Sequence, residues 1–150
     1  MSRARYILKV IRFEKQDGSA IYTRHVTETQ IRSKTGLIAA IKDARNDDRL
    51  WISVTRDDEK CGALWAAITG NHSWITYWAD GKSIDTHAFN RDRTDAEKYI
   101  EFLLDNTQPQ MVRESFTFER KTALDSLGYF VVHGVPPTRL EFTDVLDTYC

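Results

Sequence analysis

The feature that most constrains this chain is a run of alternating aromatic and aliphatic residues between Leu50 and Phe89. Aliphatic residues alternate with tryptophan, serine or threonine in Leu50–Thr55, and the same period of two recurs in Leu64–Thr69 and Trp74–Trp78. This period is typical of a β-strand, in which neighbouring residues point to opposite faces of the sheet. Short polar segments of turn-forming residues separate the runs, namely Asp57–Lys60, Gly70–His72 and Asp80–Lys82. The stretch therefore predicts an antiparallel meander.

The residues before the meander predict a hairpin and a helix. Arg5–Glu14 and Ala20–Val26 read as two strands joined by a turn that contains Asp17-Gly18. Ser33 or Thr35 can cap a helix that runs to about Arg45, because apolar residues recur there at helical spacing.

The residues after the meander predict two more helices and a final strand. Thr94–Glu97 has the form of a capping box, so we expect a helix over Thr94–Asn106. A strand is expected within Met111–Phe118. Glu119–His133 has a wide apolar face followed by Gly134, which predicts a further helix, and Arg139–Val145 reads as the last strand. The predicted fold class is therefore α+β: a mostly antiparallel twisted sheet (N-terminal hairpin, central meander and C-terminal strand) with about three helices packed mainly on one face.

Composition limits the classes of function. With 150 residues, 41% hydrophobic and 29% charged, the chain fits one globular domain over residues 1–150. The net charge of −1 does not favour a nucleic-acid partner. Two isolated cysteines, Cys61 and Cys150, are expected to be free thiols. Since no segment approaches transmembrane length, we expect a cytoplasmic protein without a membrane contact.

The sequence contains no motif for a metal, a cofactor or a nucleophile. Four histidines are scattered singly along the chain, without the spacing of a metal site. An alternative remains open, in which His72, Asp85 and His87 meet in one cleft of a small α+β enzyme or ligand-binding domain. On balance we expect a protein that is not an enzyme and has no cofactor.

Aromatic and acidic residues suggest a protein-binding surface instead. The four tryptophans all lie in the predicted meander, and core packing is the expected role of most of them. If helices cover only one face of the sheet, however, some of these aromatic side chains must be exposed. A rim of acidic residues would then surround them, made of Asp57, Asp58, Glu59, Asp80 and Asp85.

The order of these parts resembles a known family. The matching segments are Leu37–Ile41, Leu50–Val54, Gly62–Ile68, Trp74–Tyr77 with Asp80-Gly81, and a C-terminal pattern of Ala123-Leu124, Leu127, Phe130, Gly134, Pro137 and Leu140–Phe142. Across Ile31–Asp144 the chain resembles the first-numbered immunity-protein family of bacterial polymorphic toxin and contact-dependent inhibition systems, often encoded beside deaminase toxins. Phe142 stands where many members have tryptophan, and the hairpin over Arg5–Val26 looks like an addition.

The resemblance implies a non-enzymatic inhibitor. Such a protein binds the C-terminal domain of a cognate toxin as a heterodimer and covers its active site or substrate groove. A toxin that acts on nucleic acid, as a deaminase or a nuclease, has a basic cleft. The five acidic residues of the rim, with Tyr77 and Trp78 as anchors, form our predicted toxin-binding surface. Self-association of the chain is left open.

Overall fold

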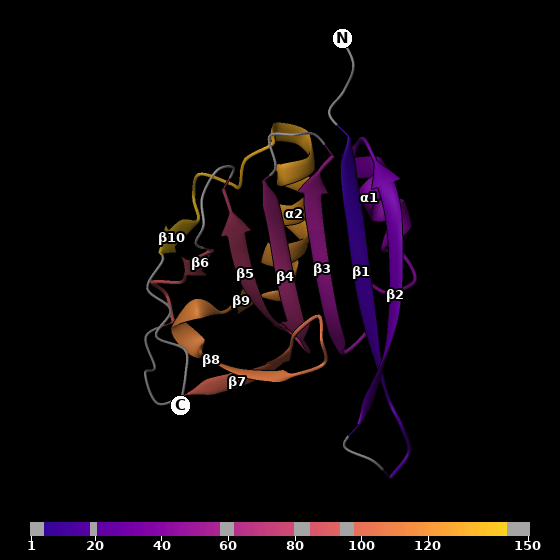
Figure 1. Ribbon diagram of the computed structural model, residues 1–150. Coiled ribbons are helices and arrows are strands. Elements are labelled where there is room, and N and C mark those ends of the chain that lie inside the picture. The colour runs from indigo at the N-terminus through magenta and orange to yellow at the C-terminus, as the bar shows by residue number, and fades with distance from the viewer. Residues whose placement is uncertain (1–4, 19–20, 58–61, 80–84, 94–97, 144–150) are drawn as a thin grey trace.

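A computed structural model gives the fold, and it describes residues 5–18, 21–57, 62–79, 85–93 and 98–143. Eight strands of these residues form one antiparallel sheet in the order β10-β6-β5-β4-β3-β1-β2, with β9 paired to β5 (Figure 1). The strands are β1 Tyr6–Lys15, β2 Tyr22–Ile31, β3 Arg49–Arg56, β4 Ala63–Thr69, β5 His72–Trp78, β6 Thr86–Phe89, β9 Phe118–Glu119 and β10 Glu141–Thr143. The predicted N-terminal hairpin, central meander and C-terminal strand are confirmed, but β2 runs to Ile31 where the prediction ended at Val26, and β10 begins at Glu141 where the predicted strand began at Arg139.

The main core lies between this sheet and two helices on one of its faces, α1 (Lys34–Ala40) and α2 (Arg120–His133). Every second residue of β3 and β4, and of β1 as far as Val10, points into it, as the period of two predicts. These side chains meet Leu127 and Phe130 of α2, both fully buried. The α2 helix ends at Gly134, whose φ of 73° is a left-handed conformation that glycine adopts without strain.

The α1 helix is shorter than predicted. Ser33 is its N-cap and accepts a hydrogen bond from the backbone N–H of Gly36 at 3.0 Å. The α-helix ends at Ala40, and turns continue the chain, in which Ile41 O accepts from the N–H of Arg45 at 2.9 Å. Leu37 and Ile41 are buried as expected, whereas the side chain of Ile38 is 52% exposed.

The helix predicted over Thr94–Asn106 is wrong. Tyr99–Leu103 is strand β7 and pairs with β8 (Pro109–Arg113) in a second, two-stranded sheet. A turn joins the strands: Leu104 N–H donates to Gln108 O at 2.9 Å, and Thr107 has a φ of 69°. The apolar residues near Tyr99 fit either period, and packing of Phe102 on Trp74 (ring centroids 6.2 Å apart) favours the strand. The capping-box residues 94–97 lie outside the described residues.

The remaining C-terminal elements are shorter than predicted. The strand expected within Met111–Phe118 is divided into the end of β8, a 3₁₀ turn over Glu114–Phe116 and β9. The described residues thus hold two α-helices where about three were expected, while the α+β class is confirmed. No helix in the described part of the chain is long and apolar enough to cross a lipid bilayer.

The central position of Phe130 gives a test of this core. Its ring lies against Tyr6 (centroids 5.8 Å apart) and Tyr77 (6.2 Å apart) and is fully buried. Phe130→Ala is expected to lower the free energy of unfolding by about 3–5 kcal/mol, because it removes apolar contacts and leaves a cavity. Urea denaturation measures the change.

The matched control for this change is Val132→Ala on the same helix, where the side chain is 57% exposed. It is expected to change the free energy of unfolding by less than about 0.5 kcal/mol. Equal effects of the two substitutions would contradict the packing described for α2.

Candidate functional site

The sheet face opposite the helices has a regular pattern of large and small side chains. In one row across the strands, Trp65 lies between Ser53 and Thr76. In the next row, Ala67 lies between Trp51 and Trp74. Ser53, Ala67 and Thr76 leave room for the rings opposite them, so the rings meet along the diagonals of the sheet, where long side chains are within reach of one another.

The aromatic rings on this face contact each other in a continuous series. Trp51 stacks on Trp65 with centroids 5.9 Å apart and an interplanar angle of 28°. Trp65 meets Trp74 edge-on at 5.0 Å, and Trp74 stacks on His87 at 5.6 Å. Such pairs contribute about 0.5–1.5 kcal/mol each beyond the area that they bury. Because the rings support one another, the series has a fixed position on the sheet.

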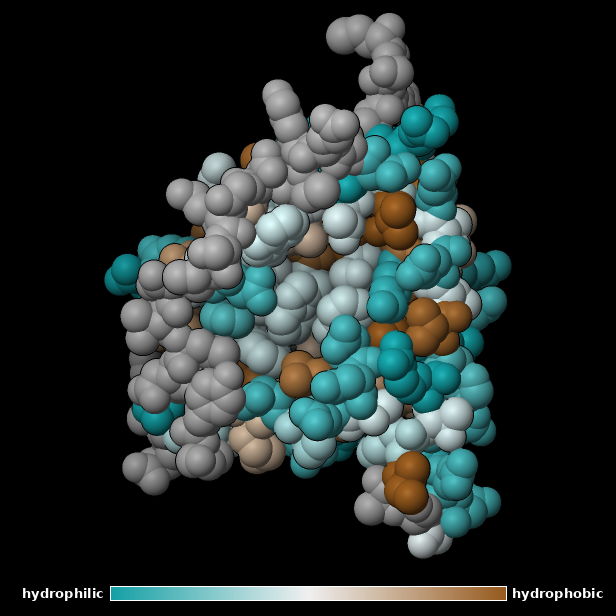
Figure 2. Space-filling model, in the orientation of Figure 1, coloured by the Kyte–Doolittle hydropathy of each residue, from teal (hydrophilic) through white to brown (hydrophobic). Residues whose placement is uncertain are grey.

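The second sheet covers one end of this face. Trp74, only 4% exposed, packs with Phe102, Val112 and Phe116. Beyond that cover, Trp51, Trp65 and Trp78 stay half-buried, and Lys9 Nζ lies 5.8 Å from the ring centroid of Trp51. We call the surface formed by Lys9, Trp51, Ser53, Trp65 and Trp78 the open face. Figure 2 views it directly and shows a shallow hollow of intermediate hydropathy over β3, β4 and β5.

Two of the predicted acidic residues lie at the same end of the sheet. Asp57 directly follows β3 and Asp85 directly precedes β6, and both side chains are exposed. Since β4 and β5 separate these strands, the two backbones lie about 14 Å apart, or three strand spacings. Gln30 Nε2 donates to Asp57 Oδ2 at 3.2 Å. Asp58, Glu59 and Asp80 lie outside the described residues.

The two predicted aromatic anchors lie on opposite faces of β5. Tyr77 packs in the core beneath the helices, with its ring 6.2 Å from Phe130 and 5.8 Å from Phe142. Trp78 points to the open face, where it is half-buried. Tyr77 therefore supports the sheet from below, and only Trp78 belongs to the surface that a partner can reach.

The three residues of the alternative enzyme site do not form one acid–base constellation. His87 is buried, and its Nδ1 lies 2.9 Å from Thr76 Oγ1. His72 accepts a hydrogen bond from Arg93 at 3.2 Å and lies four residues from Thr76 along β5, about 13 Å away. Trp74 occupies the same face between these positions. Burial lowers the pKa of His87, with the charge of Asp85 as a smaller, opposite effect. Burial and then the charge of Arg93 lower the pKa of His72.

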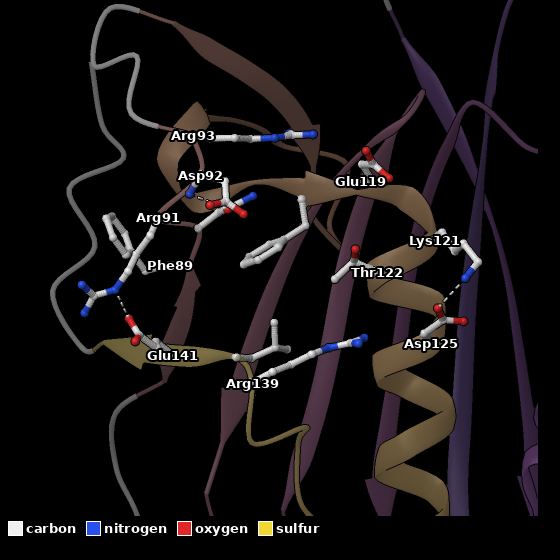
Figure 3. A pocket seen from close by; sticks show the side chains of 13 residues that line it. Phe89, Arg91, Asp92, Arg93, Glu119, Lys121, Thr122, Asp125, Arg139 and Glu141 are labelled. Atoms are coloured by element: carbon white, nitrogen blue, oxygen red, sulfur yellow. Dashed lines mark hydrogen bonds and ion pairs between the residues drawn. The ribbon is translucent and has the colours of Figure 1, made fainter.

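A separate groove of about 650 Å³ lies beside the N-terminal end of α2, between β6, β9 and the segment that leads into β10 (Figure 3). Four basic and four acidic side chains line it. Arg91 pairs with Glu141 at 2.6 Å and Lys121 with Asp125 at 3.1 Å. In each of these two pairs the acidic side chain neutralises the basic one. Among the described residues, no group of three or more His, Cys, Asp or Glu side chains is placed to hold a metal ion.

Sequence reasoning missed Trp51 and Trp65 as surface residues. It expected core positions for most of the tryptophans, whereas Trp74 alone of the four is buried. The signal was present in the alternation: both residues are out of phase with the core-facing leucines and isoleucines of their strands. Which of them would be covered depended on β7 and β8, whose place the sequence did not indicate.

Comparison of this chain with protein-family models, with curated proteins and with solved structures finds no match. The resemblance to an immunity-protein family is therefore a hypothesis that rests on the residues quoted for it.

The buried state of His87 predicts a pH dependence of stability. Its folded-state pKa is lowered, so the unfolded chain binds more protons near its ordinary pKa. The stability that comes from neutral His87 is fully present above about pH 6.5 and is lost as the pH falls toward the folded-state pKa. We expect His87→Asn to reduce the loss of unfolding free energy between neutral and mildly acidic pH, measured by urea denaturation across a pH series.

An unchanged pH profile in His87→Asn would contradict this assignment. His72→Asn is the matched variant, because the pKa of His72 shifts in the same direction from a less buried position. It is expected to remove a smaller part of the same loss.

Proposed function

We propose that this protein is an immunity-type inhibitor that binds and neutralises the C-terminal domain of a cognate bacterial toxin through its open face. The observation that carries the proposal is the set of three half-buried tryptophans on a sheet face that the helices leave uncovered. Tryptophan is enriched among the residues that dominate binding energy in protein interfaces.

The rigidity of the open face also supports binding. Trp51 and Trp65 stack on each other, and Trp65 rests on the buried Trp74. A partner that docks on these rings therefore loses little affinity to the ordering of flexible side chains. The surface is a shallow hollow built on strands, which suits a folded protein domain better than a small molecule.

Charge at the edge of the open face suits a basic partner. Asp57 and Asp85 are both exposed at the same end of the sheet, where β3 ends and β6 begins. Acidic groups at one edge can steer a basic nucleic-acid-binding cleft without a large net charge, and the chain carries only −1. We therefore infer a toxin that acts on nucleic acid, with the inhibitor working in the cytoplasm, without a cofactor and without chemistry of its own.

The first experiment is co-expression with the C-terminal domain of the protein that the neighbouring upstream gene encodes. We expect survival of cells in which that domain alone is toxic, and co-purification of a complex with one copy of each chain or a multiple of it. Survival without a complex, or no survival with a domain shown to be toxic, would contradict the proposal.

Variants of the open face then test the surface itself. Trp65→Ala is expected to weaken binding by at least about 30-fold, the equivalent of about 2 kcal/mol, because it removes the middle ring of the exposed stack. Isothermal titration calorimetry with the purified toxin domain measures it. Ile38→Ala is the matched control, since this exposed residue belongs to α1, which lies on the opposite side of the sheet.

The charge at the edge requires its own variant. Charge reversal of Asp57 and Asp85 together is expected to lower the association rate with the toxin domain and its dependence on salt. Circular dichroism verifies the fold of each variant. Wild-type affinity of Trp65→Ala, with the fold intact, would exclude the open face as the binding surface.

A further inference from the structure

Strand β2 forms one edge of the large sheet, and no described strand lies on its outer side (Figure 1). It has ten residues, against about five or six in an ordinary strand, and eight of them are exposed. Its pairing with β1 continues without a bulge from Tyr22 to Ile31. A long, regular edge strand presents a row of backbone donors and acceptors to any further strand.

Two of the usual protections of an edge strand, a proline or lysine and a bulge, are missing from β2. Its sequence, YTRHVTETQI, contains neither proline nor lysine, and the unbroken register leaves no bulge to turn the edge away. Val26, in the middle of the strand, is 43% exposed. This edge therefore has the properties of a surface that pairs with another strand.

The hydrogen bonds of the hairpin show which residues of β2 face outward. The N–H of Gln16 donates to the carbonyl of Ile21 at 3.3 Å, so these two residues are a hydrogen-bonded pair. Such pairs alternate along an antiparallel ladder. The odd-numbered residues of β2 therefore pair with β1, and the even-numbered ones direct their N–H and C=O groups away from it. The outward-facing residues are Tyr22, Arg24, Val26, Glu28 and Gln30.

We propose that β2 pairs with β2 of a second copy of this chain, antiparallel, with a two-fold axis at Val26. In this register Val26 lies opposite Val26, and Arg24 of each copy lies opposite Glu28 of the other. All the outward-facing residues then form hydrogen-bonded pairs, as the ladder requires. Two opposite-charge pairs contribute about 0.2–1 kcal/mol each, and the exposed valines cover one another.

Neighbouring registers are less favourable. An axis at Thr27 places Arg24 opposite Gln30 and Val26 opposite Glu28, and an axis at His25 places Arg24 opposite Val26. Both lose the two charge pairs. Because the strand is complementary to itself in charge at one allowed register, a second copy fits this edge better than an unrelated strand.

The pairing has a consequence for the shape of the dimer. A two-fold axis between antiparallel strands stands perpendicular to the sheet, so both copies contribute to one continuous sheet with the helices on one side. The two open faces then lie side by side on the other side. This inference does not depend on the proposed function, because it rests on the backbone edge of β2 and not on the tryptophans of the open face.

The test is the molar mass of the purified full chain, measured by light scattering coupled to size-exclusion chromatography over a concentration series. The wild-type chain of 17.4 kDa is expected to have twice this mass at the upper concentrations. Val26→Pro is expected to be a monomer, because proline removes an outward N–H and spares the bonds to β1. Val26→Thr keeps the N–H and the branched side chain, so it is expected to dimerise.

Charge reversal tests the register. Arg24→Glu and Glu28→Arg are each expected to weaken the dimer by at least tenfold, and the double variant is expected to restore it. Glu28 also lies opposite Lys9 within one chain, so thermal unfolding verifies the fold of each variant. A monomeric wild type, a Val26→Pro dimer, or a folded double variant that stays monomeric would overturn the proposal.

Discussion

Helices α1 and α2 cover only one face of the sheet, and this one-sided cover decides what the other face must be. A sheet with one bare face must either expose polar residues there or protect apolar ones by other means. Here the aromatic rings protect one another by stacking, and the β7–β8 sheet closes over one end. The second core cluster is thus a consequence of the missing helix layer.

Local sequence rules were sufficient to identify the strands of the hairpin and the meander, but not their order in the sheet. The period of two in β1, β3, β4 and β5 fixes which residues face the core, because a slip by one residue would turn Leu50, Ile52 and Val54 away from it. Turn residues such as Gly70, with a φ of 56°, place the ends of the strands. The α2 helix, predicted from Glu119 and observed from Arg120, has a wide apolar stripe and a glycine cap, two signals that agree.

The same rules failed where long-range packing decides. The residues of β7 carry apolar side chains that suit a helix or a strand, and their conformation follows from the contact of Phe102 with Trp74, a partner that lies far away in sequence. The same contrast between local pattern and long-range packing applies to the candidate site. Alternation puts Trp78 and Tyr77 on opposite faces, but only the structure shows that Tyr77, predicted as an anchor, lies on the covered one. The half-burial of Trp51 and Trp65 likewise depends on where the β7–β8 sheet ends. The local sequence of β3 and β4 does not indicate where the β7–β8 sheet ends.

Partial cover is what makes the open face suitable for binding. Full cover would turn Trp51, Trp65 and Trp78 into core residues, while no cover would leave Trp74 exposed and the stack without its buried support. With one ring buried and three half-buried, the surface keeps apolar area for a partner and yet holds its shape. The edge strand β2 follows from the same architecture: β1 is inserted between β2 and β3, so the longest unpaired edge of the described sheet points away from the open face and leaves that face accessible.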